Sequence, residues 1–449
     1  MSEPFVVIGG DAAGMSAASK ARREAPDRDI VVFERGKWVS YGACGLPYYV
    51  KGEIETLEDL VSVPAEAFRE KRNIDLRTDH EVVEIDAENE RVVAEGPEGI
   101  VEQQYGDLLI ATGASAIVPP IDGSDLPGVF TLHSLDDGKA IRTRIEEGGI
   151  ETVGIVGGGY VGVEMAEAFQ ERVRSVHLFE QLPQVLAPFG SAVGRTVAEE
   201  LREKGLRVHL ETPVDRFEGK STIESIQTPG GTHEVDLALL AVGVSPNVSL
   251  ASEAGIEIGS TGAIATDKYG ETSNENVFAA GDVAEMTHVV TGEPVHVPLA
   301  LTANRAGRAI GQTVTGSPEP VGPIAGTATL KAFDLEAGRT GLTEEEKAKA
   351  AGYEPVSISI TTESRAGYYP GGEEIQITLL GDTSTGAVLG ASMVGKEGVA
   401  KRIDTIATAL HAGVTVEELE RLDLSYAPPF GPTWDPVLTA GKVLRGSME

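Results

Sequence analysis

The segment TVGIVGGGYVG, residues 152–162, decides the fold of this chain. Residues 152–156 are apolar and predict a buried strand. The turn that follows carries three glycines at the full spacing of a dinucleotide-binding motif, namely Gly157, Gly159 and Gly162. We expect a helix over residues 163–171 and a second strand over 175–179, which ends at Glu180. The helix N-terminus would face a pyrophosphate, and the Glu180 carboxylate would accept a hydrogen bond from a ribose hydroxyl.

A second copy of this pattern, FVVIGGDAAG at residues 5–14, opens the chain. It predicts a strand, a glycine turn, a helix over residues 15–23 and a strand over 30–33 that ends at Glu34. Two glycines are in their expected places: Gly9, where the chain turns, and Gly14, where the helix packs on the strand. Two such units about 150 residues apart predict two nucleotide sites and an internal repeat of the fold.

The two copies differ from the strict motif in ways that predict their ligands. Asp11 occupies the middle glycine position of the first copy, so its carboxylate must point away from a pyrophosphate or cap the helix. In the second copy, Glu180 would repel a 2′-phosphate and no arginine directly follows it. The second site is therefore predicted to prefer NADH to NADPH.

Later apolar segments continue the two nucleotide-binding units. Residues 107–113 and 237–243 each predict a buried strand that breaks at a glycine, and residues 276–282 predict another that ends at Asp282. The Asp282 carboxylate would hold a polyol hydroxyl or cap a helix. A helix over residues 299–313 carries little charge, as expected of an element packed on the first unit. A linker follows, with Pro318, Pro320, Gly322 and Pro323.

The remaining chain predicts an α+β domain with an antiparallel sheet and no nucleotide motif. Strands are expected over residues 328–333, 356–361, 375–380 and 388–394, with helices over 399–411 and 416–421. We interpret His411 as a structural or surface residue of the first of these helices. The predicted fold is thus α/β, with two Rossmann-like domains and a C-terminal α+β domain. The expected boundaries are 1–115 and 246–323 for the first nucleotide domain, 116–245 for the second and 324–449 for the C-terminal domain.

The peptide SYGACGLPYYVKGE, residues 40–53, is where we expect the chemistry, because it holds the only cysteine, Cys44. Gly45, Leu46 and Pro47 suit the start of a helix, where the N-terminal N–H groups favour a thiolate. The alternative is a buried cysteine that acts as a small hydrophobic residue. One cysteine permits neither an internal disulfide nor a cysteine-only metal site, and we predict no metal.

Composition restricts the possible partners and the location. The net charge of −33 opposes binding to nucleic acid and to anionic membranes. A charge so widely spread is typical of proteins from salt-accumulating, halophilic organisms, although it also serves solubility in an ordinary cell. No apolar run approaches the roughly 20 residues of a membrane span, and no signal peptide is evident. We therefore expect a cytoplasmic protein.

The order of these segments resembles the FAD-dependent pyridine nucleotide-disulfide oxidoreductases over nearly the whole chain. Within that family the sequence is similar to the single-cysteine branch, which comprises coenzyme A-disulfide reductases, NADH oxidases and NADH peroxidases. The resemblance is carried by GGDAAG, GGGYVG, SYGACGLPYY, ATG at 111–113, AAGD at 279–282 and YAPPFGPTWDP at 426–436. It implies FAD in the first unit, NADH in the second with NADPH possible, and a C-terminal domain that forms a homodimer.

The resemblance also implies which residues contact the cofactors. On the FAD side these are Gly9, Gly10, Ala13, Gly14, Glu34, Ser40, Thr112, Gly113, Gly281, Asp282 and Pro298. On the NADH side they are Gly157, Gly159, Tyr160, Gly162, Glu164, Glu180 and Gly243. Tyr160 is placed over the nicotinamide, with Glu164 beside it. Lys51 would stabilise the thiolate or the reduced flavin, or it is simply a solvated lysine.

Similarity to the coenzyme A-disulfide reductases implies two tyrosines that reach the partner's cysteine. The matching positions are Tyr426 and Tyr368, with Tyr369 as a neighbour. Their O–H groups would stabilise a leaving thiolate or hold a water. Interface packing is the alternative role.

A single sulfur leaves two routes open. Its oxidised form must be a mixed disulfide with a small thiol or a sulfenic acid. The first route corresponds to reduction of coenzyme A disulfide and the second to reduction of oxygen or peroxide. Peroxidases of the family carry a histidine where this chain has Ala12, which disfavours peroxidase chemistry.

We therefore predict an NAD(P)H-dependent flavoenzyme that reduces coenzyme A disulfide through Cys44. An NADH oxidase is the alternative, and reduction of polysulfide or persulfide also remains open. Against the first reading, Ala43 stands where some coenzyme A-disulfide reductases have asparagine. Arg22 and Arg23 are candidates for binding the coenzyme A phosphates, with surface ion pairing as the alternative.

Overall fold

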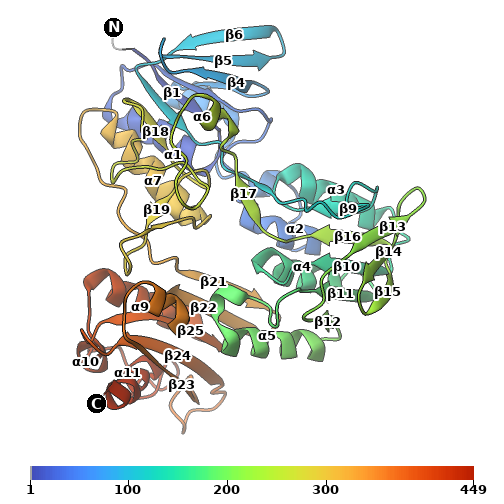
Figure 1. Cartoon of the computed structure of the whole chain (residues 1–449), viewed down its shortest axis with the longest axis vertical. Coiled ribbons are helices and arrows are strands. Elements are labelled where there is room, and N and C mark those ends of the chain that lie inside the picture. The colour runs from blue at the N-terminus through green and yellow to red at the C-terminus, as the bar shows by residue number, and fades with distance from the viewer. Residues whose placement is uncertain (1–2, 449) are drawn as a thin grey trace.

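A computed structural model describes residues 3–448, and its elements form three sheet-based units stacked along the long axis (Figure 1). The first nucleotide unit lies at the top, the second in the middle and the C-terminal domain at the bottom. No helix among the described residues is long and apolar enough to cross a membrane. The predicted fold class is confirmed.

The first unit is built on a five-stranded parallel sheet with the order β18-β7-β1-β2-β3. Its strands are Phe5–Ile8 (β1), Ile30–Phe33 (β2), Asp75–Arg77 (β3), Asp107–Ile110 (β7) and Val277–Ala279 (β18). Two helices pack together on this sheet, Ala12–Glu24 (α1) and Ala300–Thr313 (α7). They approach closely because α7 presents glycines: a Cβ on Gly307 would lie 2.1 Å from the Ala13 carbonyl oxygen.

The second unit repeats this arrangement with the order β12-β11-β10-β16-β9. Its strands are Val129–Thr131 (β9), Thr152–Val156 (β10), Ser175–Phe179 (β11), Arg207–His209 (β12) and Leu237–Leu240 (β16). Its helices are Leu135–Glu146 (α3), Tyr160–Gln170 (α4) and Ser191–Glu203 (α5). The internal repeat expected from the two glycine motifs is thus confirmed. Both motif helices begin about three residues before their predicted starts, because each helix follows its glycine turn directly.

Several small antiparallel sheets were not predicted from the sequence. Two three-stranded sheets are formed by Glu81–Asp86 (β4), Arg91–Gly96 (β5) and Gly99–Gln104 (β6), and by Arg216–Gly219 (β13), Ile223–Thr228 (β14) and Gly231–Glu234 (β15). Two-stranded pairs join Ala114–Ala116 (β8) to Val244–Pro246 (β17) and Met286–Thr287 (β19) to Pro294–Val295 (β20). The β8–β17 pair lies where the chain passes between the two nucleotide units (Figure 1).

The C-terminal domain has a fully antiparallel sheet with the order β21-β22-β25-β24-β23. The strands are Ala328–Ala332 (β21), Leu335–Gly341 (β22), Pro355–Glu363 (β23), Glu374–Asp382 (β24) and Val388–Gly395 (β25). The helices are Glu345–Ala350 (α8), Val399–Ala412 (α9), Val416–Glu420 (α10) and Pro436–Met448 (α11). Strand β22 and helices α8 and α11 were not predicted. His411 is exposed in the last turn of α9, as expected for a surface residue.

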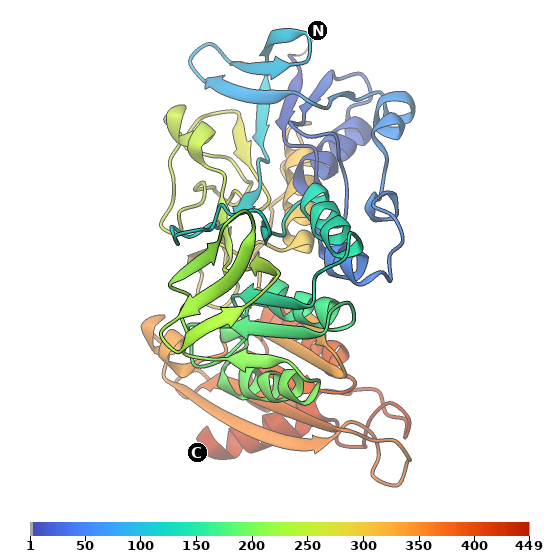
Figure 2. The same cartoon turned by 90° about the vertical axis from the view of Figure 1, so that its right-hand side faces the viewer.

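One short helix connects the two nucleotide units. Leu46–Lys51 (α2) contacts both α3 and α4 of the second unit, although its chain comes from the first (Figures 1 and 2). The remaining helix, Ser249–Glu253 (α6), covers the small β4–β6 sheet. The segment that carries the cysteine is therefore held at the boundary between the two nucleotide units.

Candidate active site

Cys44 lies in a 3-10 turn, Ala43–Gly45, that runs directly into α2. Its side chain is exposed, and it is the only cysteine of the chain. The turn is packed tightly, because a Cβ on Gly45 would lie 2.2 Å from Cδ2 of Leu60. Pro47 occupies the first turn of α2, as predicted. The alternative of a buried, inert cysteine is thereby wrong.

Hydrogen bonds tie this segment to the first glycine turn. The Ser40 N–H donates to the Gly10 carbonyl at 3.0 Å, and the Tyr41 N–H donates to Asp11 Oδ1 at 3.0 Å. Asp11 makes no side-chain hydrogen bond that caps α1, so the capping alternative is wrong. Burial raises the pKa of Asp11 to about 6, with the Tyr41 N–H acting against this rise and the Glu34 and Asp282 carboxylates adding to it. Asp11 therefore anchors the cysteine segment.

The first glycine turn fits the pyrophosphate of a dinucleotide. A Cβ on Gly9 would lie 2.1 Å from the Ala111 carbonyl oxygen, and one on Gly14 would lie 1.9 Å from the Gly9 carbonyl oxygen. No side chain caps the N-terminus of α1, so its N–H groups remain able to bind phosphate. The Glu34 carboxylate is fixed at the ribose position, because it accepts from the N–H groups of Gly10 and Gly36 at 2.7 and 2.8 Å.

The second glycine turn has the same construction. A Cβ on Gly157 would lie 2.3 Å from the Ala241 carbonyl oxygen, and one on Gly162 would lie 1.9 Å from the Gly157 carbonyl oxygen. A Cβ on Gly159, by contrast, would meet no atom within 4 Å, so this glycine leaves open space before α4. Glu180 accepts from the N–H of Gly158 at 2.7 Å and of Leu182 at 2.9 Å. The turn therefore fits a second dinucleotide.

Three of the residues assigned to cofactors lie where the chain crosses between the units. Thr112 Oγ1 donates to the Asn247 carbonyl at 3.0 Å, and Asn247 Nδ2 donates back to the Thr112 carbonyl at 2.8 Å. Gly113 and Gly243, with φ of 66° and 116°, flank the β8–β17 pair. Their contact with cofactors stays a prediction. In the structure they hold together the two chain segments that pass between the nucleotide units.

The remaining first-unit residues lie beside α1 and α7. A Cβ on Gly281 would lie 3.1 Å from Cβ of Ala13, so the turn after β18 touches the start of α1. Asp282 follows in this turn and no helix begins there, so its helix-capping alternative is wrong. Its pKa is raised by burial, while His133 and His296 act in the opposite direction. Pro298 directly precedes the N-cap of α7.

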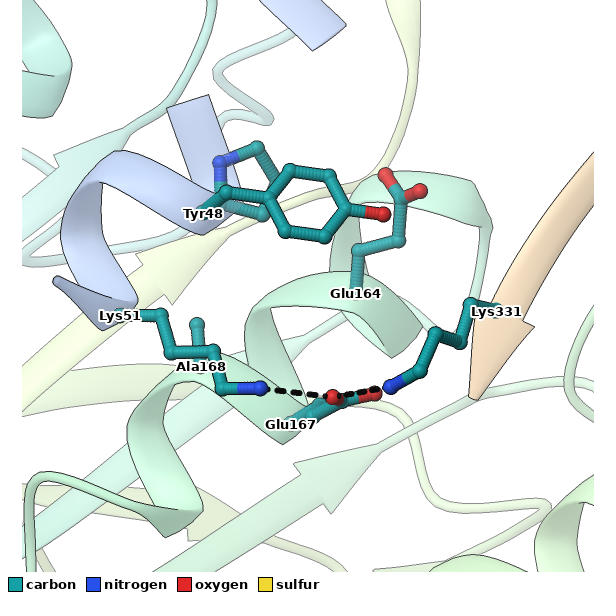
Figure 3. A pocket seen from close by; sticks show the side chains of 7 residues that line it. Tyr48, Lys51, Glu164, Glu167, Ala168 and Lys331 are labelled. Atoms are coloured by element: carbon teal, nitrogen blue, oxygen red, sulfur yellow. Dashed lines mark hydrogen bonds and ion pairs between the residues drawn. The ribbon is translucent and has the colours of Figure 1, made fainter. Parts of the chain in front are cut away.

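Glu164 and Tyr48 face each other beside the cysteine helix (Figure 3). Burial, together with the neighbouring Glu167 carboxylate, raises the pKa of Glu164 to about 7. Desolvation also raises the pKa of Cys44, followed by the Glu164 and Asp282 carboxylates. The expectation that this position lowers the thiol pKa is therefore wrong for the polypeptide alone. The main cause is desolvation of the thiol, and the two acidic side chains add to it.

A network of ion pairs joins all three units below this site. Glu167 of α4 accepts from Lys51 of α2 at 3.0 Å and from Lys331 of β21 at 2.6 Å, and the Phe333 N–H donates to it at 2.7 Å. Lys51, Glu167 and Lys331 line, together with Tyr48 and Glu164, a cavity of about 10 Å³, room for about one water (Figure 3). Lys51 also pairs with Glu53 at 2.7 Å. Lys51 is therefore not a solvated lysine, and its action on the thiolate or the reduced flavin stays a prediction.

Tyr160 forms another link between the second unit and the C-terminal domain. It is the first residue of α4, and its hydroxyl accepts from Arg339 Nε of β22 at 2.9 Å. Its ring lies 5.2 Å from that of Phe189. The contacts of Arg339 and Lys331 were not predicted. The sequence around each residue is that of an ordinary strand, and the partners lie in another domain.

The two tyrosines expected to reach the partner's cysteine are brought together. The hydroxyls of Tyr368 and Tyr426 lie 2.6 Å apart, with the side chains 75% and 47% exposed. Their loops are fixed by Arg402, which is buried. It pairs with Asp435 at 3.1 Å and donates to the Ser364 carbonyl at 3.0 Å. The sequence predicted the tyrosines but not this buried ion pair beneath them.

The two candidate coenzyme A residues lie at the far end of α1, about 15–18 Å along the helix from Asp11. Arg22 donates to the carbonyls of Pro26 at 2.5 Å and Asn73 at 2.7 Å, so it is largely occupied by backbone contacts. Arg23 is exposed. Phosphate binding by either residue stays a prediction.

Comparison with known proteins gives a consistent family relationship. Residues 3–307 match the pyridine nucleotide-disulphide oxidoreductase family, and residues 327–436 match its dimerisation domain. The chain is 42% identical to an NAD(P)H coenzyme A polysulfide/persulfide reductase of Pyrococcus horikoshii, over 99% of both chains. It is 36% identical to an NADH oxidase of Methanocaldococcus jannaschii, over 97% of both. It is 29% identical to a coenzyme A disulfide reductase of Staphylococcus aureus, over 95% of this chain and 96% of that one.

Two solved structures share the fold throughout. An NAD-dependent persulfide reductase from A. fulgidus superposes with a TM-score of 0.96 at 38% identity, over 99% of this chain and 83% of that one. A water-forming NADH oxidase from Lactobacillus brevis, bound to NADH, superposes with a TM-score of 0.95 at 25% identity, over 100% of this chain and 99% of that one.

Proposed function

The chain belongs to the pyridine nucleotide-disulphide oxidoreductase family, and on that premise we propose that it reduces sulfur–sulfur bonds of coenzyme A-linked substrates through Cys44. It is an NAD(P)H-dependent flavoprotein oxidoreductase whose cofactors are FAD and NAD(P)H. A coenzyme A polysulfide or persulfide is the first candidate substrate and coenzyme A disulfide the second. This order follows the relatives, of which the 42% identical one is named for polysulfide and persulfide and the 29% identical one for disulfide.

The observation that carries the proposal is one exposed thiol with no second cysteine in 449 residues. The Cys44 thiolate attacks the inner sulfur of a coenzyme A persulfide, forms a mixed disulfide with coenzyme A and releases hydrosulfide. Two electrons and one proton then return the Cys44 thiolate and free coenzyme A. Bound FAD would supply that electron pair, which originates from NAD(P)H.

Residues of the chain hold the reactants in place. The first glycine turn, with Glu34, would hold FAD, and the second, with Glu180, would hold NAD(P)H. Asp11 fixes the cysteine segment to the first turn. The raised pKa of Glu164, about 7, suits a carboxyl group that exchanges a proton near the thiol. The Glu180 carboxylate would repel a 2′-phosphate, so NADH is the expected nucleotide. The net charge of −33 leads us to predict that the enzyme requires salt.

We further propose a homodimer in which the Tyr368–Tyr426 pair of one subunit reaches Cys44 of its partner. Both side chains are exposed, as are Phe430 and Trp434 at 72% and 68%. Apolar side chains so exposed are typical of a surface that another chain covers. The tyrosine hydroxyls would donate to the sulfur that leaves as thiolate.

We expect Tyr368→Phe and Tyr426→Phe each to lower kcat for a coenzyme A persulfide by about 10- to 100-fold, because each removes a donor to the leaving sulfur. The double variant should be little worse than either one, since the two hydroxyls share a hydrogen bond of 2.6 Å. Tyr369→Phe, the neighbouring partly exposed tyrosine, is the matched control and should stay within about twofold of the parent. Unchanged kcat in all three would leave the pair a purely packing role.

A second candidate function is an NADH oxidase, because a 36% identical relative and one of the structures carry that name. Steady-state NADH oxidation under argon, with coenzyme A persulfide or coenzyme A disulfide as acceptor, compared with air alone, separates the candidates. We expect kcat/KM for the persulfide to exceed that for oxygen by at least about 100-fold, a difference of about 2.7 kcal/mol in barrier. A higher kcat/KM with oxygen would overturn the proposal in favour of the oxidase.

A further inference from the structure

Three of the eight histidines of the chain meet at one point in the second nucleotide unit. His177 comes from β11, His209 from β12 and His233 from β15, all labelled in Figure 1. One ring nitrogen of each imidazole can serve as a ligand, and these three nitrogens lie within 4.8 Å of one another. The cluster is separate from Cys44, and neither glycine turn contributes a side chain to it.

Strand register explains why the three side chains converge. In the β11–β12 pair, His209 lies opposite Phe179, and His177 lies opposite Arg207. Residues two apart on a strand share a face, so His177, Phe179 and His209 face the same way. The β15 strand then covers this face with His233. The Phe179 ring forms an apolar floor, 4.7 Å from the His209 ring and 4.9 Å from that of His233.

The imidazoles have few competing partners. His177 is 4% exposed, and the other two are half-buried. Within residues 3–448, no carboxylate forms an ion pair with any of the three. The polar contacts are His177 Nδ1 to His209 Nε2 at 3.2 Å, Arg207 Nη1 to His177 Nε2 at 3.2 Å, and Thr228 Oγ1 to His233 Nε2 at 3.3 Å. Because the Arg207 guanidinium can only donate, His177 Nε2 carries no proton, and this imidazole is in the neutral form that binds metals.

We propose that His177, His209 and His233 bind one Zn²⁺, which fastens the β13–β15 sheet to the β11–β12 edge of the nucleotide-binding sheet. Neutral imidazoles are preferred Zn²⁺ ligands, and three of them leave a fourth position for water. Tetrahedral Zn²⁺ with bonds of about 2.05 Å sets ligand nitrogens about 3.4 Å apart. The 3.2 Å pair already meets this spacing, whereas the other nitrogens, within 4.8 Å of one another, must move closer by side-chain rotation.

Arg207 opposes the metal and so gives the proposal a distinctive test. Its guanidinium donates to His177 Nε2, which leaves the proton of the neutral ring on Nδ1, the nitrogen that faces His209. Metal binding requires this proton to leave Nδ1 and appear on Nε2, and the guanidinium to swing away. The Arg207 side chain is exposed, so its guanidinium can move into solvent. Removing this cation should therefore strengthen metal binding.

The experiment uses the full-length, FAD-loaded protein after removal of metals by a chelator, with Cys44 alkylated so that it binds no metal. Titration with Co²⁺, followed by its visible absorption, and with Zn²⁺, followed calorimetrically, should show one equivalent bound. His209→Gln and His233→Gln should abolish this equivalent, whereas the exposed His411→Gln should keep it. Arg207→Met should tighten binding by about tenfold, since it removes a positive charge beside a dication.

The site is supported if the parent binds one equivalent of metal, if both cluster variants lose it and if Arg207→Met binds it more tightly. The proposal is overturned if the parent binds no equivalent, if the cluster variants keep it, or if Arg207→Met does not strengthen it. Flavin absorbance and far-ultraviolet circular dichroism of each variant show that it is folded. His209 and His233 are half-buried, which makes glutamine a mild replacement at both positions.

Discussion

Cys44→Ser should lower kcat/KM for a coenzyme A persulfide, and for coenzyme A disulfide, by at least about 10³-fold. A serine hydroxyl is almost entirely protonated at neutral pH and forms no mixed disulfide. The variant therefore lacks the sulfur that attacks the substrate and, as a mixed disulfide, accepts the electron pair. The position tolerates the change structurally, because the side chain is exposed at the start of α2. Stopped-flow and steady-state NADH oxidation under argon measure the effect.

The same variant should reduce ferricyanide with NADH at a rate within about twofold of the parent, since one-electron acceptors need no thiol. Ala43→Ser is the matched control, because it places a hydroxyl in the same 3-10 turn while keeping the sulfur. It should retain most of the persulfide activity. Full persulfide turnover by Cys44→Ser would instead identify a flavoprotein electron carrier that makes no use of thiol chemistry.

Gly162→Ala should abolish reduction by NADH at concentrations that saturate the parent, while FAD remains bound. Its Cβ would lie 1.9 Å from the Gly157 carbonyl oxygen, so the second glycine turn cannot keep its shape. The equivalent change in the first turn, Gly14→Ala, creates the same 1.9 Å clash with Gly9 and should yield protein without FAD. The flavin-to-protein absorbance ratio and NADH titration of each variant measure the two losses separately.

Gly159→Ala distinguishes nucleotide binding from the integrity of the turn. A Cβ there meets no protein atom within 4 Å, but it fills the space in front of α4. We expect the melting temperature and the flavin content to stay unchanged while KM for NADH rises at least about tenfold. Gly446→Ala, at an equally open position in α11, is the control and should change neither quantity. An unchanged KM in Gly159→Ala would place the nucleotide elsewhere.

Local sequence predicted the two nucleotide units well, because the glycine motifs fix a turn and its neighbours together. The strands Thr152–Val156 and Ser175–Phe179 have their predicted bounds, and Glu34 and Glu180 both lie at their turns. Short sheets such as β13–β15 carry no comparable signal, since their strands alternate irregularly and pack on a partner from elsewhere in the chain. The C-terminal sheet was predicted apart from β22, whose glycines and charges obscure its pattern.

The side-chain network of the site was harder to predict than the fold. Asp11 read as a possible helix cap, yet its partner is the Tyr41 N–H, which no local pattern indicates. Lys51 read as a thiolate partner, yet the carboxylate of Glu167 on α4 holds it. The pKa of Cys44 is raised by desolvation and then by Glu164 and Asp282, which are far away in sequence. The histidine cluster was missed for the same reason, because its members lie on three separate strands.

The central claim is that the oxidised form of Cys44 is a mixed disulfide with a small thiol. Intact-mass analysis of the protein, after reaction with one equivalent of coenzyme A persulfide or disulfide under argon and without reductant, tests it most directly. We predict that the mass increases by one coenzyme A joined through a disulfide, that the adduct maps to Cys44 and that dithiothreitol removes it. An unmodified thiol, or a mass increase of one oxygen instead, would contradict the claim.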